Sequence, residues 1–319
     1  MNDRINKQLK NKIGELMYLI ETKDLTKRYS HVNVVDHVNM HIEENSIYGF
    51  VGENGSGKTT IMRLLTGLAE PTSGGFTMFG VDNKSPHIYK YRKQLSAIVE
   101  TTSLEPTMTA IENMRYLELY LGIKLTNEER KNLLTKVNLG SVGNKKVKNF
   151  SLGMKQRLGI ALALINKPKL MLLDEPMNGL DPEGIAELRD LLIDLCQREN
   201  MTILISSHIL SELEKIASHY GFIHKGHLIE EITAEELQNK CRKSLNVKVD
   251  NVGNATNALR EINITDLKTS PNGEIKIYDD VRIVDVIKVL DKNKVEILAI
   301  NSNDESVEDY YLNLIKEVR

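Results

Sequence analysis

The chain has few cysteines, no long apolar run and little net charge, and each shortage excludes a class of protein. Its only cysteines, Cys196 and Cys241, are too few for a disulfide framework or a zinc site, and they suit a reducing compartment. No apolar run reaches the roughly 18 residues that would span a bilayer. The formal net charge of -2 gives no basic footprint, so no nucleic-acid partner is expected.

The composition is that of a globular protein of about two domains. Hydrophobic residues make up 41% of the 319 residues and charged residues 27%, which supports a sizeable core without disorder. The first residues are polar and basic without an apolar centre, so they are not a secretory signal. We expect an N-terminal extension over 1–16, a larger domain over 17–232 and a smaller domain over 240–319.

One stretch of the larger domain has the pattern of a phosphate-binding loop, G-x-x-x-x-G-K-[ST]. It follows a β-prone segment, 46–51, and precedes helical spacing at 60–65. Glycines let backbone N–H groups point at phosphate oxygens, and the following helix turns its positive end to the same anion. Lys58 reaches the β- and γ-phosphates and Thr59 places its hydroxyl on Mg²⁺. The expected nucleotide-binding residues are Gly52, Glu53, Asn54, Gly55, Ser56, Gly57, Lys58, Thr59 and Thr60. The alternative is a glycine-rich turn with an incidental Lys-Thr pair.

A buried strand that ends in two acids supplies the second part of this site. The apolar residues 170–173 are followed directly by Asp174 and Glu175. Asp174 holds Mg²⁺ through its water shell, and Glu175 is placed to polarise a water that attacks the γ-phosphate. The alternative is an ordinary pair of surface acids at a strand end. Combined with the phosphate-binding loop, the pair predicts hydrolysis of ATP.

The remaining pattern predicts how the elements are arranged. We expect one half-buried strand over 32–42, helices over 109–121 and 128–137 that form a helical insert, and a helix over 210–217. Ser151 is a good N-cap for a further helix. The smaller domain has the order β-α-β-β-α-β-α, which resembles a small α+β sandwich, and it contains no motif with attached chemistry.

Over about residues 19–237 the chain resembles the ATP-binding cassette (ABC) ATPases. Residues 150–157, Phe-Ser-Leu-Gly-Met-Lys-Gln-Arg, look like a variant of the L-S-G-G-Q signature, and residues 178–181 look like the D-loop, which ends at Asp181. The resemblance implies an α/β fold, a P-loop NTPase cassette with a RecA-like core, an antiparallel β subdomain and a helical subdomain, followed by the small C-terminal α+β domain. It also implies that ATP and Mg²⁺ are the cofactors.

The same resemblance assigns further site residues. His208 stands where the switch histidine belongs, at the end of a buried strand, and is expected to be catalytic together with Glu175; Tyr29 matches the aromatic residue that stacks on adenine. In the family the signature closes over the γ-phosphate that the opposite subunit's P-loop holds. The resemblance therefore implies a head-to-tail dimer of two copies. Leu152 replaces the first glycine of the usual pair and Met154 the usual glutamine. The signature residues expected at the opposite subunit's ATP are Ser151, Leu152, Gly153 and Met154.

Glu100 stands where the family usually places a glutamine that senses the metal site and contacts the membrane partner. With an acidic residue at this position, the chain resembles exporters that give bacteria immunity to lantibiotics or resistance to bacitracin-type peptides. This implies an ATPase that docks through residues 100–121 on separate transmembrane permease subunits, at the inner face of the cell membrane, and drives peptide export. The alternative that Glu100 is an isolated Gln-to-Glu exchange in an unrelated exporter stays open. So does a soluble cassette ATPase acting on the ribosome or DNA, although those relatives typically carry two cassettes or long heptad arms.

Overall fold

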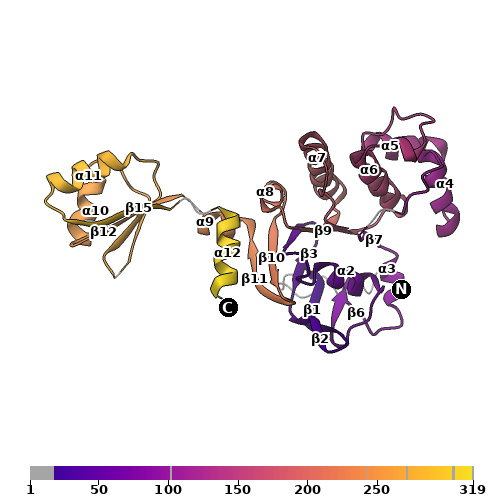
Figure 1. Ribbon diagram of the computed structural model, residues 1–319, viewed down its shortest axis with the longest axis horizontal. Helices are drawn as coiled ribbons and strands as arrows, with labels where there is room; N and C mark the ends of the chain where they lie inside the picture. Colours follow the sequence, from indigo (N-terminus) through magenta and orange to yellow (C-terminus); the bar gives the residue numbers. More distant parts are fainter. Residues whose placement is uncertain (1–17, 101–102, 242, 271, 304–305, 318–319) are drawn as a thin grey trace, which may run out of the picture. The chain divides into compact units, whose positions relative to one another are not determined.

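The chain folds into two units that divide between Ala234 and Glu235. The computed structural model describes residues 18–100, 103–241, 243–270, 272–303 and 306–317 (Figure 1). The predicted N-terminal extension, residues 1–16, lies outside the described residues. The predicted α/β cassette with an added α+β domain is confirmed.

A six-stranded sheet in the order β11-β10-β4-β9-β8-β7 forms the centre of the first unit. Five neighbours in this sheet run parallel: β4 (Ile47–Val51), β7 (Leu95–Ile98), β8 (Leu170–Asp174), β9 (Thr202–Ser207) and β10 (His219–His224). Every residue of β4, β8 and β9 is buried, as expected of parallel strands covered on both faces. The edge strand β11 (His227–Thr233) pairs with β10 as an antiparallel hairpin.

Helices cover this sheet. The helix α2 (Lys58–Thr66) follows the phosphate-binding loop and buries Ile61, Met62, Leu64 and Leu65. The other helices of this core are α3 (Ile88–Arg92), α7 (Pro182–Glu199) and α8 (Leu210–Leu213). The predicted helix over 210–217 was too long. After Leu213 the chain closes as a turn, in which Ala217 N–H donates to the Leu213 carbonyl at 2.8 Å, and Ser218 N–H then donates to the Ile47 carbonyl at 2.9 Å as the chain reaches the sheet.

A second, antiparallel sheet in the order β2-β1-β5-β6, with β3 also paired to β1, lies beside the core. Its strands are β1 (Tyr18–Tyr29), β2 (Val32–Val38), β3 (His41–Glu43), β5 (Ser73–Met78) and β6 (Val81–Asp82). The single strand predicted over 32–42 is wrong, because the chain breaks between β2 and β3. The buried Thr22 hydroxyl stabilises the break: it donates to the Val38 carbonyl and accepts from Met40 N–H, both at 2.8 Å.

Three helices form the predicted helical subdomain: α4 (Ala110–Leu121), α5 (Asn127–Lys136) and α6 (Leu152–Ala163). Both α4 and α5 begin with a capping box, which satisfies their first backbone N–H groups. A buried ion pair joins the two helices: Arg130 donates to both carboxylate oxygens of Glu118, at 2.7 and 2.6 Å. The cap predicted for α6 is confirmed, since Ser151 Oγ accepts from Met154 N–H at 3.2 Å.

The second unit contains a four-stranded antiparallel sheet in the order β13-β14-β12-β15. Its elements are α9 (Ala234–Lys240), β12 (Ser244–Val249), α10 (Val252–Arg260), β13 (Leu267–Thr269), β14 (Glu274–Ile277), α11 (Ile283–Lys292), β15 (Ile297–Asn303) and α12 (Val307–Glu317). Alternate residues of β12 and β14 pack with α10 and α11 in one apolar core. The element order β-α-β-β-α-β-α is the predicted one.

Candidate nucleotide-binding and hydrolysis site

The phosphate-binding loop joins β4 to α2 at the carboxyl edge of the parallel sheet. Gly57 has a φ of 110°, and a Cβ there would lie 2.7 Å from the Val34 carbonyl, so both conformation and space require glycine. The Lys58 ammonium is 5% exposed and donates to the carbonyls of Gly52 at 2.5 Å and Glu53 at 3.1 Å. The loop therefore holds a cation at its centre, beside the N-terminus of α2, where phosphate oxygens would be attracted.

Thr59 and Asp174 meet across the sheet edge and form an oxygen-rich corner. The Thr59 hydroxyl donates to Asp174 Oδ2 at 2.7 Å, and the Ser206 hydroxyl donates to Oδ1 at 2.7 Å. A hydroxyl and a carboxylate fit Mg²⁺, which prefers hard oxygen ligands and takes few of them from protein. No group of three or more His, Cys, Asp or Glu residues suited to a metal ion occurs in the described part of the chain.

Glu175 follows Asp174 directly and is held in an unusual conformation. Its φ is 49°, in the left-handed region, and its N–H donates to Ser206 Oγ at 2.9 Å. One carboxylate oxygen, Oε2, is hydrogen-bonded to His208 Nδ1 at 2.8 Å. The other, Oε1, lies 3.5 Å from Lys58 Nζ and is buried without a hydrogen-bond partner. An acceptor of this kind, close to the phosphate-binding lysine, is suited to a water molecule.

The signature and the D-loop contact each other within the chain. Leu152, which is 51% exposed, extends over Gly179: a Cβ at Gly179, whose φ is 72°, would lie 2.9 Å from Leu152 Cδ2. Asp181 caps α7 by accepting from Gly184 N–H at 3.1 Å. Among the contacts of the described residues, none joins the P-loop to Ser151 or Gly153, and α2 and α6 are separate in Figure 1.

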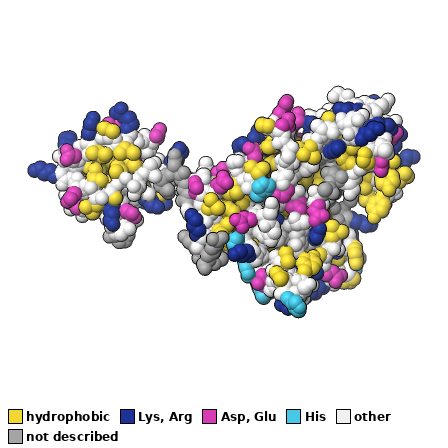
Figure 2. Space-filling view, in the orientation of Figure 1, with side chains coloured by type: hydrophobic (Ala, Val, Ile, Leu, Met, Phe, Trp, Pro, Cys, Tyr) yellow, Lys and Arg dark blue, Asp and Glu magenta, His cyan; other side chains and the backbone are white. Residues whose placement is uncertain are grey.

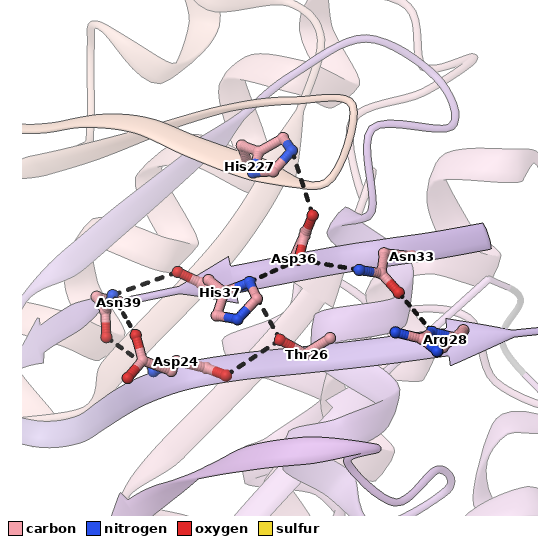
Figure 3. Close-up of polar contacts among 8 residues, drawn as sticks. All are labelled: Asp24, Thr26, Arg28, Asn33, Asp36, His37, Asn39 and His227. Carbon is pink, nitrogen blue, oxygen red and sulfur yellow. Dashed lines mark hydrogen bonds and ion pairs between the residues drawn. The ribbon is translucent and has the colours of Figure 1, made fainter. Parts of the chain in front are cut away.

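Tyr29 lies at the end of β1, and a polar network within its hairpin extends to His227 of β11 (Figure 3). The ring is 45% exposed, with Lys27 Nζ 5.0 Å from its centroid. Next to it, Arg28 donates to Asn33 at 2.8 Å, and Asn33 donates to Asp36 at 3.0 Å. Cation and network hold the hairpin in place and leave part of the tyrosine ring accessible.

Asp36 is the centre of this network. His37 Nδ1 lies 2.7 Å from Asp36 Oδ1 and His227 Nε2 lies 3.5 Å from Oδ2. The hydrogen bond with His37 is the main reason that the pKa of Asp36 is lowered. Asp36 N–H donates to the Gly226 carbonyl at 2.8 Å, and Gly226 N–H donates to the Ser56 carbonyl at 2.9 Å. The turn between β10 and β11 thus joins the Tyr29 hairpin to the phosphate-binding loop.

Glu100 is connected to the phosphate-binding loop through α2. Its φ is 69°, and its carboxylate is paired with the Arg63 guanidinium. A cleft of about 410 Å³ is lined by Glu100, Asp174, Glu175 and Leu152, among other residues. The structure therefore brings Glu100 to the same cleft as the two acids of β8 and the loop after it.

Ser206 is a site residue that sequence reasoning missed. It pairs with Asp174 in the sheet register and bonds to both Asp174 and Glu175. A signal was present in the sequence: Ser206 and Ser207 end an apolar strand just before His208. Polar residues at the carboxyl ends of buried parallel strands gather at one edge of the sheet, which is where α/β proteins bind ligands.

Comparison with known proteins gives the family. The ABC transporter family pattern matches residues 35–178. The chain is 40% identical over 299 residues to the bacitracin transport ATP-binding protein BcrA of Bacillus licheniformis, which covers 93% of this chain and 97% of that protein. It is 44% identical over 211 residues to the lantibiotic transport ATP-binding protein SrtF of Streptococcus pyogenes, which covers 66% of this chain and 89% of that protein.

Solved structures agree in fold. A structure of the ATP-binding subunit of an ABC transporter superposes with a TM-score of 0.60 at 29% identity, covering 70% of this chain and 92% of that one. The cassette MJ0796, solved as a dimer in a post-hydrolysis state with ADP and Pi, gives a TM-score of 0.60 at 24% identity, covering 67% of this chain and 98% of that one. No helix in the described residues is long and apolar enough to cross a membrane. The chain therefore belongs to the ABC transporter family, and it is an ATP-binding, ATP-hydrolysing transporter subunit.

Proposed function

We propose that the chain drives export of an antimicrobial peptide or antibiotic through a separate membrane permease. The observation that carries the proposal is the 40% identity to a bacitracin transport protein over 93% of the chain, which includes both units. Glu100, at the position that suggested peptide exporters, lines the catalytic cleft. None of the relatives named above supports an ATPase of the ribosome or DNA.

In the proposed site each residue has a separate task. The N–H groups of the phosphate-binding loop and Lys58 bind the β- and γ-phosphates. Thr59 and Asp174 hold Mg²⁺, which neutralises phosphate charge when bound. Glu175 Oε1 accepts the proton of the attacking water, and His208, 2.8 Å from Oε2, fixes the orientation of the carboxylate. Tyr29 stacks on the adenine ring.

A second copy of the chain completes the site. Ser151 and Gly153 stand at the N-terminus of α6, where backbone N–H groups are free to bind an anion, yet they do not contact the phosphate-binding loop of their own chain. A head-to-tail pair would place residues 151–154 over the ATP of the other copy. The contact between Leu152 and Gly179 would then move the signature and the D-loop together.

The surface of α4 is the proposed contact with the permease. Tyr116, Leu119 and Tyr120 lie on one face of the helix and are 64%, 83% and 85% exposed. Figure 2 shows hydrophobic side chains gathered over this helix. Large exposed apolar side chains that cluster mark an interaction surface. Docking there would hold the chain at the inner face of the cell membrane.

The test is a resistance assay in a sensitive bacterium that expresses the chain together with its permease. Resistance to bacitracin or to a lantibiotic is expected with the intact pair and not with the chain alone. Equal sensitivity of cells with and without the pair to every peptide would contradict the proposed substrate class.

Two variants separate the parts of the proposal. Glu175→Gln should abolish resistance and keep co-purification with the permease. Leu119→Glu combined with Tyr120→Glu should abolish co-purification and keep ATP binding. The matched control is Leu298→Glu, because Leu298 is 55% exposed but lies in the second unit. Loss of co-purification in the control as well would contradict the assignment of α4.

A further inference from the structure

A second cavity of about 390 Å³ lies in the first unit, away from the nucleotide site. Its walls come from α5, from the segment 164–169 and from the chain between α7 and β9. None of the predicted site residues lines it. The segment 164–169 joins the C-terminal end of α6 to the first residue of β8. The cavity therefore borders the connection between the helix that carries the signature and the strand that ends at Asp174.

The interior of this cavity is apolar. Leu125, Leu164, Ile165 and Met201 line it and are 8%, 4%, 2% and 3% exposed, and Leu133 lines it from α5. Its volume lies within the range of about 300–1,000 Å³ that is typical of small-molecule sites. An apolar chain placed here would lose its own contact with water, which stabilises the bound state by about 25 cal/mol for each Å² of its surface that is covered.

The rim of the cavity is positively charged. Glu199 is paired with Lys136, and Glu129 accepts hydrogen bonds from the N–H and hydroxyl of Thr126. Lys167 and Lys169 also line the cavity, and neither ammonium has an ion-pair partner within the described ranges. The hydrogen bonds from Thr126, and with them the charge of Lys167, lower the pKa of the Glu129 carboxyl, so three lysines against two glutamates leave the rim with one cation in excess.

We propose that this cavity binds a small amphiphilic anion, with its hydrocarbon chain against Leu133 and Ile165 and its carboxylate at Lys167 and Lys169. The apolar interior accounts for the chain and the rim for the charge. Such a ligand would touch α5 and the connection between α6 and β8 at the same time. Binding of such a ligand is independent of which compound the transporter exports.

The probe is decanoate, titrated into the full-length chain without nucleotide and followed by calorimetry. Saturable binding at one site is expected. Decanol has the same hydrocarbon without the charge and should bind at least tenfold more weakly. Lys167→Glu combined with Lys169→Glu should weaken decanoate binding at least tenfold. Lys131→Glu is the matched control, because Lys131 is an exposed lysine of α5 that does not line the cavity, and it should bind as the original chain does.

Leu133→Trp tests the interior directly. The larger side chain fills the cavity and should abolish decanoate binding. The sequence contains no tryptophan, so the emission of the new residue also reports whether it is buried. Unchanged ATP binding establishes that the variant is folded. Decanoate isotherms that do not saturate, or that are equal in the original chain and in both the tryptophan and the double-glutamate variants, would overturn the proposal.

Discussion

The two units differ in how they treat buried polar groups. In the described part of the chain, the buried side-chain polar atoms without a hydrogen-bond partner all belong to the first unit: they lie on Ser56, Arg92, Arg157, Glu175, Glu212 and His224. In the second unit, by contrast, the buried Ser244 hydroxyl donates to Asn246 Oδ1 at 3.4 Å. Because an unpaired buried polar group costs stability, the retention of two such groups at the phosphate-binding loop, on Ser56 and on Glu175 next to Lys58, indicates a place prepared for another molecule.

Backbone conformation shows the same division. Glu100 and Glu175 have φ values of 69° and 49°, a conformation that costs on the order of 1–3 kcal/mol in a residue with a side chain. Both residues face the catalytic cleft. Among the described residues of the second unit, the non-glycine residues with positive φ are Asn263 and Lys294. Each follows a helix, where the left-handed conformation is an ordinary way to end it. Backbone strain at residues that line the candidate catalytic cleft is therefore a feature of the first unit.

The largest expected effect is that of Glu175→Gln. The amide keeps the size of the side chain but cannot take a proton, so ATP turnover should fall by roughly 10²- to 10⁴-fold while ATP binding is kept. Phosphate release and an ATP-binding isotherm measure the two quantities. Glu183→Gln, at an exposed glutamate in the first turn of α7, is the matched control and should turn over normally. Normal turnover by Glu175→Gln would remove the base from the proposed site.

The next effect concerns stability and should stay within the first unit. Arg130→Met leaves the Glu118 carboxylate buried without its partner, which should cost about 3–5 kcal/mol of unfolding free energy. Glu118→Leu with Arg130→Met should recover most of that loss, because the remaining charge is removed too. Chemical denaturation followed separately for the two units gives the measurement. A double variant no more stable than the single one would contradict this account.

The same ion pair should make the first unit sensitive to acid. The hydrogen bonds from Arg130 are the main reason that the pKa of Glu118 is lowered from 4.5. A lowered pKa in the folded state means that the stabilisation is complete above the pKa of the unfolded chain and is lost as pH falls through the folded pKa. Stability of the first unit measured down through this window should fall more steeply in the original chain than in the double variant.

Much of the site could be predicted because its residues are close in sequence. The phosphate-binding loop, the pair Asp174 and Glu175, and the cap at Ser151 are each a local pattern with strand or helix spacing on either side. The fold class followed from the same spacing and from the family resemblance. The break between β2 and β3 could not be predicted, because it depends on the hydroxyl of Thr22 in a neighbouring strand.

What local patterns missed are pairings between distant segments. Ser206 reaches Asp174 only because β8 and β9 are neighbours in register. Arg63 pairs with Glu100, and Leu152 covers Gly179, although each pair lies more than 20 residues apart in the sequence. A side chain's neighbours across a sheet or a helix interface depend on topology, which periodicity does not determine.

The smallest expected effect on stability compares matching helix caps in the two units. Ser151 caps α6 and Asn251 caps α10, each by accepting from a backbone N–H three residues later, at 3.2 and 3.0 Å. Replacing either residue by alanine should cost about 1 kcal/mol of unfolding free energy. Only Ser151→Ala should also lower ATP turnover, because a head-to-tail pair would place residues 151–154 over the ATP of the other copy, where the Ser151 hydroxyl would donate a hydrogen bond to the phosphate. Loss of a charge-assisted hydrogen bond worth about 1.5–3 kcal/mol corresponds to a fall in ATP turnover of roughly 10- to 100-fold. Turnover that stays normal in Ser151→Ala, with stability lowered as in Asn251→Ala, would reduce the signature serine to a helix cap like its counterpart and remove the need for a second copy at the site.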